Sequence, residues 1–347
     1  MTFPEELIKW YLFNKRDLPW RHTKDPYVIW LSEIILQQTR VEQGLPYFNK
    51  FLENFPTVKA FAEANEAKVL KLWQGLGYYS RGRNMHATAQ VVMEKYDGKF
   101  PVLHDELITL KGIGEYTAAA ISSFSSGEAR AVVDGNVFRV LSRFFGISTP
   151  INSPQGKKAF YNLANEMLYT NDPSTYNQAI MEFGALQCKP KSPNCGICPL
   201  NLGCYALKNN LVQVLPIKLK KAPQKHRFLN YFILIHNNNV LIRERQVGDI
   251  WQHLFDFPSI ETSDATSLDD NDFMLQIKST FGNDVDAQFI THKRHVLTHQ
   301  ILHIQFFELK NYIFNFSKQK ELYWVSLAGL NERPQPKVIH DFVSEYF

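Results

Sequence analysis

Four cysteines, Cys188, Cys195, Cys198 and Cys204, are the only cysteines among the 347 residues and lie in one short segment. Their spacing is C-x6-C-x2-C-x5-C. Because thiolates bind soft metals and a C-x2-C pair lets two sulfurs reach one centre, they predict a four-thiolate site. The prolines between them suit a loop wrapped around a [4Fe-4S] cluster. The spacing alone does not separate iron from structural zinc, and disulfides are the alternative in an oxidising compartment.

Two glycines, Gly112 and Gly114, form a Gly-x-Gly turn between two short helical patterns in LKGIGEYTAAAISSF. Glycine permits a tight turn and lets a phosphate approach the backbone, while the free amides that start the next helix favour an anion. The pattern predicts a helix-hairpin-helix over about residues 106–124. A plain helical hairpin is the alternative.

Two acids stand among apolar residues, Glu33 in WLSEIILQQT and Asp134 in VVDGNVFR. If Glu33 is buried, its pKa should rise, and it could serve as a general acid near neutral pH. The alternative for Glu33 is an exposed position on an amphipathic helix. The alternative for Asp134 is a capping role at a helix that begins near Val137.

The segment from Pro4 to about Ile180 must position these groups, and its apolar residues return every three or four positions, as is typical of helices. Prolines divide it into many short helices. We therefore predict one all-α domain over residues 1–207 that ends in the cysteine loop.

The remainder of the chain has a different pattern. Residues 208–227 carry six Lys or Arg and no acid, which indicates a basic linker. Residues 228–347 contain alternating aromatic and β-branched runs typical of strands. An Asn cluster at 237–239 indicates a hairpin turn, and LDDNDFMLQIKSTF indicates a helix that starts at Asp. We predict an α+β domain here. The strand runs are RFLNYFILIHNNNVLIRER, THQILHIQFFELKNYIF and ELYWVSL.

Composition sets broad limits on function. The net charge of +4 and the pI near 8.7 are compatible with a polyanionic partner without requiring one. The amino terminus lacks a cationic region followed by an apolar core, and no segment approaches the roughly 20 apolar residues that span a bilayer. We expect a cytoplasmic protein, associated with the nucleoid if it is bacterial, that does not bind membranes and is a monomer.

Six segments carry a resemblance to a known family. They occur in the order and with the spacing of the helix-hairpin-helix DNA glycosylases, and the chain most resembles the MutY-like adenine DNA glycosylases. The resemblance covers the helical half almost throughout. The segments are WLSEIILQQT, LWQGLGYYSRGRN, LKGIGEYTAAAI, VVDGNVFRVLSR, QAIMEFGALQC and the cysteine loop.

The resemblance implies an enzyme of base-excision repair that removes adenine mispaired with 8-oxoguanine or guanine in double-stranded DNA. Such an enzyme flips its target base out of the stack. In the resemblance, Glu33 matches the acid that protonates adenine. Asp134 matches the carboxylate that faces the oxocarbenium-like sugar and stabilises it electrostatically or by a transient covalent bond. Two carboxyl groups with divided roles resemble those of glycoside hydrolysis.

Other matched positions imply supporting roles. Bifunctional endonuclease III-like glycosylases carry a lysine nucleophile two residues after the second hairpin glycine, where this chain has Tyr116. We therefore expect a monofunctional glycosylase in which Tyr116 and Asn136 support the acids by hydrogen bonds. Tyr78 matches an aromatic wedge inserted into the DNA stack, and Gln38 a residue that fills the space around the flipped nucleotide. Arg81 is a candidate phosphate contact.

The carboxy-terminal half resembles the Nudix-like module with which adenine glycosylases recognise 8-oxoguanine. The similarity rests on DIWQHLFDFP and KRHVLTHQILHIQF. The family's Phe-Ser-His loop is matched by Leu297, Thr298 and His299, so a hydroxyl and an imidazole are kept and the aromatic ring is lost. The acid-rich helix that Nudix hydrolases need for magnesium is absent from the sequence. We expect a binding module without pyrophosphatase activity.

Two alternative functions stay open at this point. One is an endonuclease III-like glycosylase/lyase, which Tyr116 opposes. The other is a non-catalytic iron-sulfur protein that only binds DNA, and the presence of both Glu33 and Asp134 opposes it because a pure binder needs neither acid. In each case the cluster is expected to be structural and to position DNA.

Overall fold

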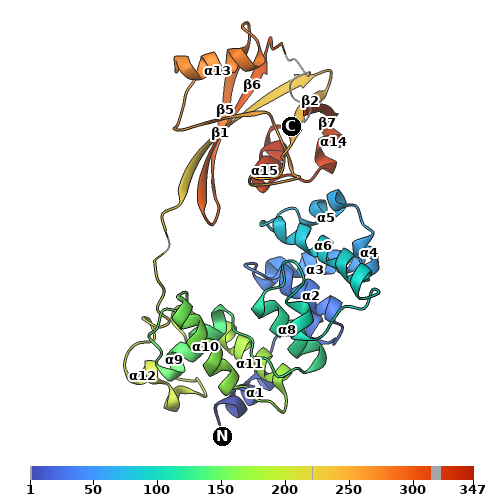
Figure 1. The fold of residues 1–347 in the computed structure, drawn as a ribbon. Helices are drawn as coiled ribbons and strands as arrows, with labels where there is room; N and C mark the ends of the chain where they lie inside the picture. The colour runs from blue at the N-terminus through green and yellow to red at the C-terminus, as the bar shows by residue number, and fades with distance from the viewer. Residues whose placement is uncertain (1, 221, 314–321) are drawn as a thin grey trace. The chain divides into compact units, whose positions relative to one another are not determined.

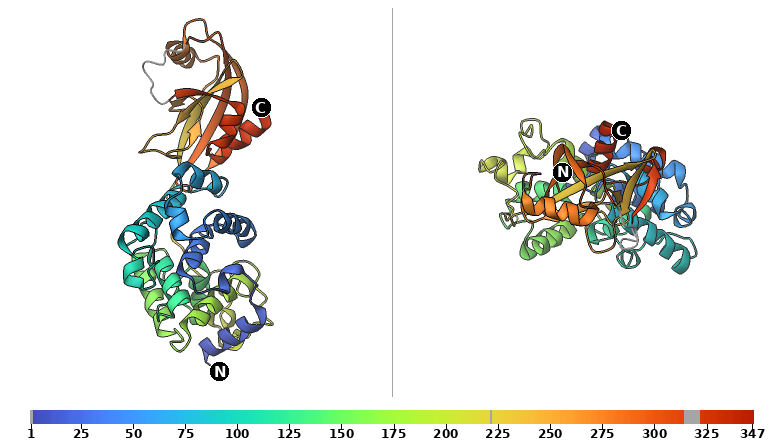
Figure 2. Two further views of the ribbon diagram at one scale, coloured as in Figure 1. Left: turned by 90° about the vertical axis from the view of Figure 1, so that its right-hand side faces the viewer. Right: turned by 90° about the horizontal axis from the view of Figure 1, so that it is seen from above.

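The computed structural model describes residues 2–220, 222–313 and 322–347, and it divides into two compact units (Figures 1 and 2). The first unit comprises Met1–Ala64 and Asn84–Lys221, and the second Asn65–Arg83 and Ala222–Phe347. Segment 65–83 therefore groups with the carboxy-terminal half by its contacts. Among the described residues, no helix combines the length and apolar character needed to cross a membrane.

The first unit is helical, as predicted, with no strand among its described residues. Its helices are short because prolines and capping side chains begin them at close intervals, with Asp25, Thr57, Ser153 and Asp172 each accepting a bond from a backbone amide of the first turn. The helices are α1 (Phe3–Asn14), η1 (Pro19–Arg21), α2 (Pro26–Ile35), α3 (Val41–Asn54), α4 (Val58–Ala62), α7 (His104–Leu107), α8 (Glu115–Ser126), α9 (Gly135–Phe145), α10 (Pro154–Glu166), α11 (Pro173–Leu186), η2 (Asn201–Gly203) and α12 (Tyr205–Lys208).

Two further helices belong wholly or partly to the second unit. Helix α5 (Glu66–Trp73) lies within it, and α6 (Ser80–Lys95) begins in it and continues into the first unit. The boundary between the units therefore falls inside a helix rather than in a loop.

The rest of the second unit is built on a mixed sheet, which confirms the α+β prediction. Strands pair in the order β3-β2-β1-β6-β5, with β4 on β1 and β7 on β2. The long strand β1 runs parallel to β6, whereas the other pairs are antiparallel. The strands are β1 (Lys225–His236), β2 (Asn239–Glu244), β3 (Phe255–Asp256), β4 (Ser259–Thr262), β5 (Asp286–Val296), β6 (Gln300–Lys310) and β7 (Leu322–Ser326).

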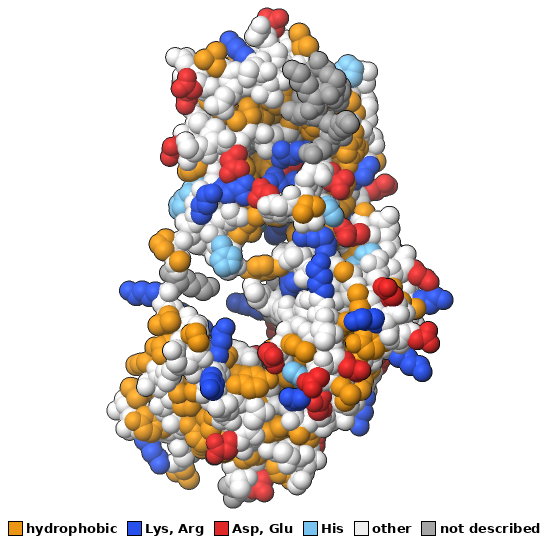
Figure 3. Space-filling model, viewed as in Figure 1, with side chains coloured by type: hydrophobic (Ala, Val, Ile, Leu, Met, Phe, Trp, Pro, Cys, Tyr) orange, Lys and Arg blue, Asp and Glu red, His pale blue; other side chains and the backbone are white. Residues whose placement is uncertain are grey.

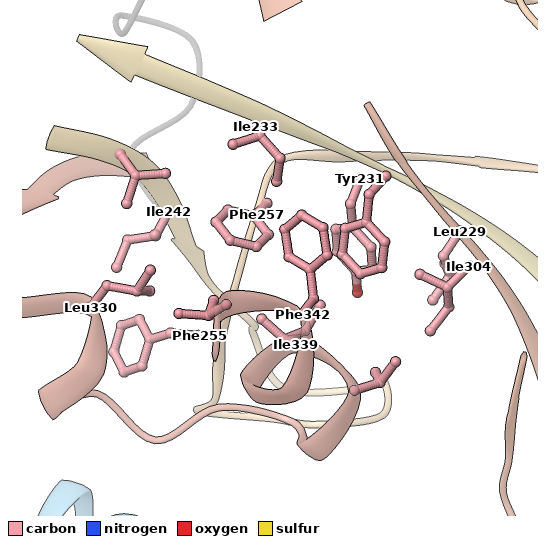
Figure 4. Close-up of a cluster of buried hydrophobic side chains, with 14 of the residues drawn as sticks. Leu229, Tyr231, Ile233, Ile242, Phe255, Phe257, Ile304, Leu330, Ile339 and Phe342 are labelled. Carbon is pink, nitrogen blue, oxygen red and sulfur yellow. The ribbon is translucent and has the colours of Figure 1, made fainter. Parts of the chain in front are cut away.

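Helices cover both faces of this sheet. On one face, Tyr231 and Phe342 of α15 (Lys337–Tyr346) belong to one buried cluster (Figure 4). Phe306 belongs to the same cluster, and its ring stacks on that of Phe342 at 3.9 Å. On the other face, Phe232 packs against Phe281 of α13 (Asn271–Phe281). Strand alternation places neighbouring side chains of β1 on these two opposite cores. A further short helix, α14 (Leu327–Glu332), follows β7.

Two local predictions in this half are confirmed. Asn237 and Asn238 adopt positive φ values of 48° and 61°, as a tight hairpin between β1 and β2 requires. Asp270 caps α13 by accepting bonds from the amides of Asp272 and Phe273. The last residue of one predicted strand run, 314, and the first of another, 321, lie outside the described residues.

Charged side chains of both signs are interspersed over the described residues of the face drawn in Figure 3. This distribution agrees with the modest net charge of +4. Overall charge therefore does little to identify a binding surface, and the candidate site must be argued from individual side chains.

Candidate active site

Glu33 lies on α2 and is only 9% exposed, which excludes the alternative of a surface glutamate. Tyr116, in the first turn of α8, donates a hydrogen bond of 2.8 Å to Oε2 of Glu33. Burial raises the pKa of Glu33 to about 7, although the bond from Tyr116 and the charge of Arg21 act in the opposite direction. A carboxyl group with this pKa can deliver a proton near neutral pH.

Asp134 is the capping residue of α9, as its alternative interpretation proposed, but it also lines the same cavity as Glu33. Its Oδ1 accepts bonds from the amides of Asn136 at 2.8 Å and Val137 at 2.7 Å. Its Oδ2 accepts a 2.8 Å bond from Nδ2 of Asn136. Burial raises the pKa of Asp134, and these hydrogen bonds limit the rise. Capping therefore orients the carboxylate and leaves it beside the cavity.

A cavity of about 680 Å³ brings together residues that lie far apart in the sequence. Glu33 and Tyr116 line it from two helices, and Asp134 and Asn136 line it from the start of a third. Gln38 also lines it and has a φ of 58°, a left-handed conformation that costs free energy for a residue with a side chain. The space is large enough for a nucleobase and its sugar, and its two carboxyl groups have different surroundings.

Glu182 of α11 supports one wall of this cavity, and sequence reasoning missed it. Its side chain is 1% exposed and accepts bonds from the guanidinium groups of Arg16 and Arg21, with four donor-to-oxygen distances between 2.7 and 3.0 Å. Burial would raise the pKa of Glu182, but the two guanidinium groups lower it to about 2. The signal was present in QAIMEFGALQC, where one acid stands among apolar residues.

Arg139 was also missed, and it connects the cavity to the cysteine loop. Its guanidinium donates to Oδ1 of Asn136 at 2.8 Å, to the carbonyl of Gly184 at 2.6 Å and to the carbonyl of Cys188 at 2.7 Å. One turn later, Arg143 donates to the carbonyls of Lys189 and Pro190. Two arginines four residues apart on a mostly apolar helix would have been the sequence signal.

The cysteine loop forms its own pocket. Cys188, Cys195, Cys198 and Cys204 all line it, and none is in a disulfide. Over residues 2–220, 222–313 and 322–347, no group of three or more His, Cys, Asp or Glu side chains is arranged to hold a metal ion. The donor set of four thiols on one pocket nevertheless has the chemistry that an iron-sulfur cluster requires.

The Gly-x-Gly turn joins α7 to α8, and its two glycines have different geometry. Gly112 has a φ of 83°, and an added Cβ there would lie 2.9 Å from Cβ of Asn84. Gly114 has a φ of −100°, and an added Cβ would meet nothing within 4 Å. Backbone conformation therefore requires glycine only at the first position, while the second leaves open space at the start of α8.

We expect Gly112→Ala to lower the free energy of unfolding by at least about 1–2 kcal/mol, because alanine is strained in the left-handed region and would contact Asn84. The loss should appear in urea denaturation of the first unit's helices. Gly114→Ala is the matched control and should lose less than about 1 kcal/mol, the cost of a poorer residue at the start of α8, because its φ is ordinary and a Cβ meets nothing. Equal losses for both variants would contradict the assignment of the turn geometry.

The predicted wedge and recognition loop lie in the second unit. Tyr78 has a φ of 47° and is 46% exposed, and its hydroxyl contacts the hydroxyl of Thr298. Leu297 packs against the hydrophobic core on the α15 face of the sheet, and His299 is exposed. The guanidinium of Arg81 lies over the rings of Trp73 and Tyr78, and burial lowers its pKa to about 10.

Comparisons with protein families cover both halves of the chain. Residues 31–165 match the model of the HhH-GPD superfamily base excision DNA repair protein, and residues 230–345 match a NUDIX domain. The chain is 34% identical to the adenine DNA glycosylase of Buchnera aphidicola subsp. Acyrthosiphon pisum (strain APS) over 99% of both proteins. It is 39% identical to the human adenine DNA glycosylase over 59% of this chain and 39% of that protein.

Solved structures resemble the helical half. A thermostable thymine-DNA glycosylase is similar with a TM-score of 0.56 and 29% identity, over 60% of this chain and 95% of its own. A trapped endonuclease III-DNA covalent intermediate gives a TM-score of 0.53 and 21% identity, over 60% of this chain and 95% of its own, which supports the fold alone.

Proposed function

Because the chain belongs to the adenine DNA glycosylase family, we propose that it excises adenine paired with 8-oxoguanine or guanine in duplex DNA. Members of this family are base-excision repair enzymes that hydrolyse an N-glycosidic bond. The observation that carries the proposal is the cavity in which Glu33, with a pKa near 7, faces the same space as Asp134. We further propose that it acts as a monomer, at the nucleoid if the cell is bacterial.

The two carboxyl groups divide the reaction between them. Glu33 in its acid form donates a proton to a ring nitrogen of the flipped adenine, so that the base leaves as a neutral molecule when the C1′–N9 bond breaks. The sugar is left with positive charge, and the carboxylate of Asp134 stabilises it electrostatically or by a transient covalent bond. Water then adds its oxygen to C1′ and gives up a proton to the carboxylate of Glu33, which restores the acid form of Glu33 and leaves an abasic site.

Neighbouring side chains keep each acid in its role. The hydroxyl of Tyr116 holds the carboxyl group of Glu33 at 2.8 Å. Asn136 and two backbone amides hold Asp134, and Arg139 in turn holds Asn136. Since Tyr116 stands where a lyase would need an amine to form a Schiff base, the proposed enzyme releases the base without cutting the strand.

We assign the space around the flipped nucleotide to Gln38, which lines the cavity. Recognition of DNA outside the cavity we assign to the hairpin glycines Gly112 and Gly114, to Arg81, and to the Tyr78 and Leu297-to-His299 region of the second unit. Thr298 and His299 keep the hydrogen-bonding groups that could distinguish 8-oxoguanine from guanine. The contact between the hydroxyls of Tyr78 and Thr298 supports a joint role for the wedge and the loop.

We propose that the four cysteines hold a [4Fe-4S] cluster. The fit rests on four thiols around one pocket and on Arg143, whose guanidinium holds the carbonyls next to Cys188. Base excision transfers no electrons, so the reaction does not require a redox role for the cluster. A bound cluster would instead stabilise the loop and position DNA. Arg139 links the loop to Asn136 by hydrogen bonds to the carbonyl of Cys188 and to Oδ1 of Asn136.

The proposal is tested by single-turnover release of adenine from duplexes that carry adenine opposite 8-oxoguanine, guanine or thymine. Release is expected with the first two and not with the third, with strand breaks only after alkali. Strand cleavage without alkali would indicate a lyase. Release at equal rates from all three duplexes would contradict the proposed mispair specificity.

We expect Thr298→Val to lower the preference for 8-oxoguanine over guanine by about 2- to 10-fold, which corresponds to one hydrogen bond. The comparison is the ratio of single-turnover rates on the two duplexes at subsaturating enzyme. Thr291→Val, on β5, is the matched control and should leave the ratio unchanged. An unchanged ratio for Thr298→Val would remove this hydroxyl from the recognition of the lesion.

A further inference from the structure

Another cavity lies on the α13 face of the sheet, and its lining does not include residues 297–299. It is built from cross-strand rows of β1, β6 and β5. Phe228 is paired with His303, and Asn230 with Gln305, on adjacent parallel strands. On β5, Arg294 pairs with His303. Further along the same face, Phe232 is in the apolar core against α13. Along this face of β1, the side chain of Phe232 therefore lies in the apolar core, whereas Asn230, two residues earlier, already lines the cavity.

The chemistry of the lining is specific. The rings of Phe228 and His303 stack at 4.6 Å with an angle of 14° between their planes. Two buried polar atoms on the lining have no hydrogen-bond partner among the described residues: Oε1 of Gln305, which accepts, and the hydroxyl Oγ1 of Thr266, which can accept or donate. Because buried polar atoms in native proteins are nearly always satisfied, these two atoms indicate a polar partner with at least one donor group, which Oε1 of Gln305 requires.

Size and charge narrow the class of that partner. The cavity volume is about 140 Å³, close to the roughly 150 Å³ of an apolar protein cavity that holds one benzene ring. The lining includes no Asp or Glu, and His292 and Arg294 on it are exposed. A flat ring with N–H donors fits the interior, and an attached anionic group fits the basic rim.

From these observations we propose that this cavity binds a nucleobase of a nucleotide, with the ring beside Phe228 and His303, its N–H edge toward Gln305 and Thr266, and its phosphate toward Arg294. Guanine is the best match because its ring N1–H and the adjacent exocyclic N2 amino group are neighbouring donors, one for Oε1 of Gln305 and one for the hydroxyl of Thr266 acting as an acceptor. The nucleotide is either free or part of a DNA strand, since both present the same base and phosphate. This cavity lies in the second unit, whereas Glu33 and Asp134, which are proposed to catalyse adenine excision, lie in the first.

The test is calorimetric titration of the full-length protein with dGMP and with deoxyribose 5-phosphate, which lacks the base. The wild type should bind dGMP in a saturable manner and at least tenfold more tightly than the sugar phosphate. Gln305→Leu should weaken dGMP binding at least tenfold. Gln288→Leu, an exposed glutamine on β5 outside the cavity lining, is the matched control and should bind as the wild type does.

A second titration identifies the source of the base. A single-stranded hexamer with one guanine is compared with the same hexamer carrying an abasic site there. An advantage for the guanine strand that disappears in Gln305→Leu, together with weak dGMP binding, would assign the site to a DNA strand. An advantage for dGMP alone would assign it to a free nucleotide. Thermal unfolding of each variant checks the fold, and Arg294→Ala replaces Gln305→Leu if the latter is unfolded.

Three results would overturn the inference. Equal binding of dGMP and deoxyribose 5-phosphate would leave only a phosphate contact. Unchanged dGMP binding by Gln305→Leu would show that dGMP binds at another site on the protein. If neither dGMP nor the guanine hexamer binds in a saturable manner, the cavity holds only water. Adenine excision, measured in parallel, depends on the catalytic residues Glu33 and Asp134 of the first unit and tests the proposed function independently.

Discussion

Glu33→Gln is expected to lower the single-turnover rate of adenine release by about 10²- to 10⁴-fold, the usual contribution of a general acid. Glutamine keeps the size of the side chain and can accept the bond from Tyr116, but it has no proton to give. The rate is measured on a duplex with adenine opposite 8-oxoguanine at saturating enzyme. Glu53→Gln, an exposed change on α3, should leave the rate within about twofold of the wild type.

The same substitution should affect stability in the opposite direction. The pKa of Glu33 is raised by burial from 4.5 to about 7, so the ionised carboxylate destabilises the folded state above pH 4.5. We therefore expect Glu33→Gln to increase the free energy of unfolding by about 1–3 kcal/mol at pH 8. A variant that is both inactive and less stable would indicate a structural role for Glu33 instead.

The pH dependence of the wild-type rate provides a further check. Because Glu33 must be protonated, the rate should fall about tenfold per pH unit above its pKa of about 7. Asp134 must be ionised, so the rate should also fall at acid pH. The hydrogen bond from Tyr116 lowers the pKa of Glu33, and Tyr116→Phe should therefore move the alkaline limb to higher pH. A limb that moves to lower pH would contradict this assignment.

Glu182→Gln is expected to lower the free energy of unfolding by about 3–5 kcal/mol, because it leaves two guanidinium groups without their shared carboxylate. Arg16 lines the cavity, so adenine release should also become slower. Urea denaturation at pH 7 measures the loss. Glu166→Gln, an exposed change at the end of α10, is the matched control and should shift stability by less than about 0.5 kcal/mol.

The sign of the pH effect at Glu182 is opposite to that at Glu33. The pKa of Glu182 is lowered from 4.5 to about 2, so its stabilisation is fully present above pH 4.5 and is lost as the pH falls toward 2. The difference in stability between the wild type and Glu182→Gln should therefore shrink over this range. A difference that stays constant from pH 7 to pH 3 would show that the carboxylate charge is not what stabilises this wall.

Local patterns were sufficient for much of the fold. The repeat of apolar residues predicted the helical half, and alternation predicted the strands that follow. Asn237 and Asn238 specify a turn because they tolerate positive φ, and Asp270 specifies a helix start because its side chain bonds the next amides. Such signals depend on residues within a few positions of each other, so a single sequence carries them completely.

Such local patterns could not predict the order of the strands in the sheet or the division of the chain into two units. The parallel pairing of β1 with β6 joins residues about 75 positions apart, and the sequence of either strand alone does not predict which strand it pairs with. The carboxy-terminal helix α15 was not predicted, although it closes one face of the sheet. Segment 65–83 has helical local patterns, but its contacts place it with the second unit.

The sequence by itself determined the chemistry available to this protein: four thiols in one loop, a glycine turn, and two acids in apolar surroundings. Only the tertiary structure decided that Glu33 and Asp134 share a cavity, that Glu182 joins Arg16 and Arg21, and that Arg139 connects the cavity to the cysteine loop. The physical reason is that pKa and orientation depend on burial and on partners distant in sequence, which packing alone brings together.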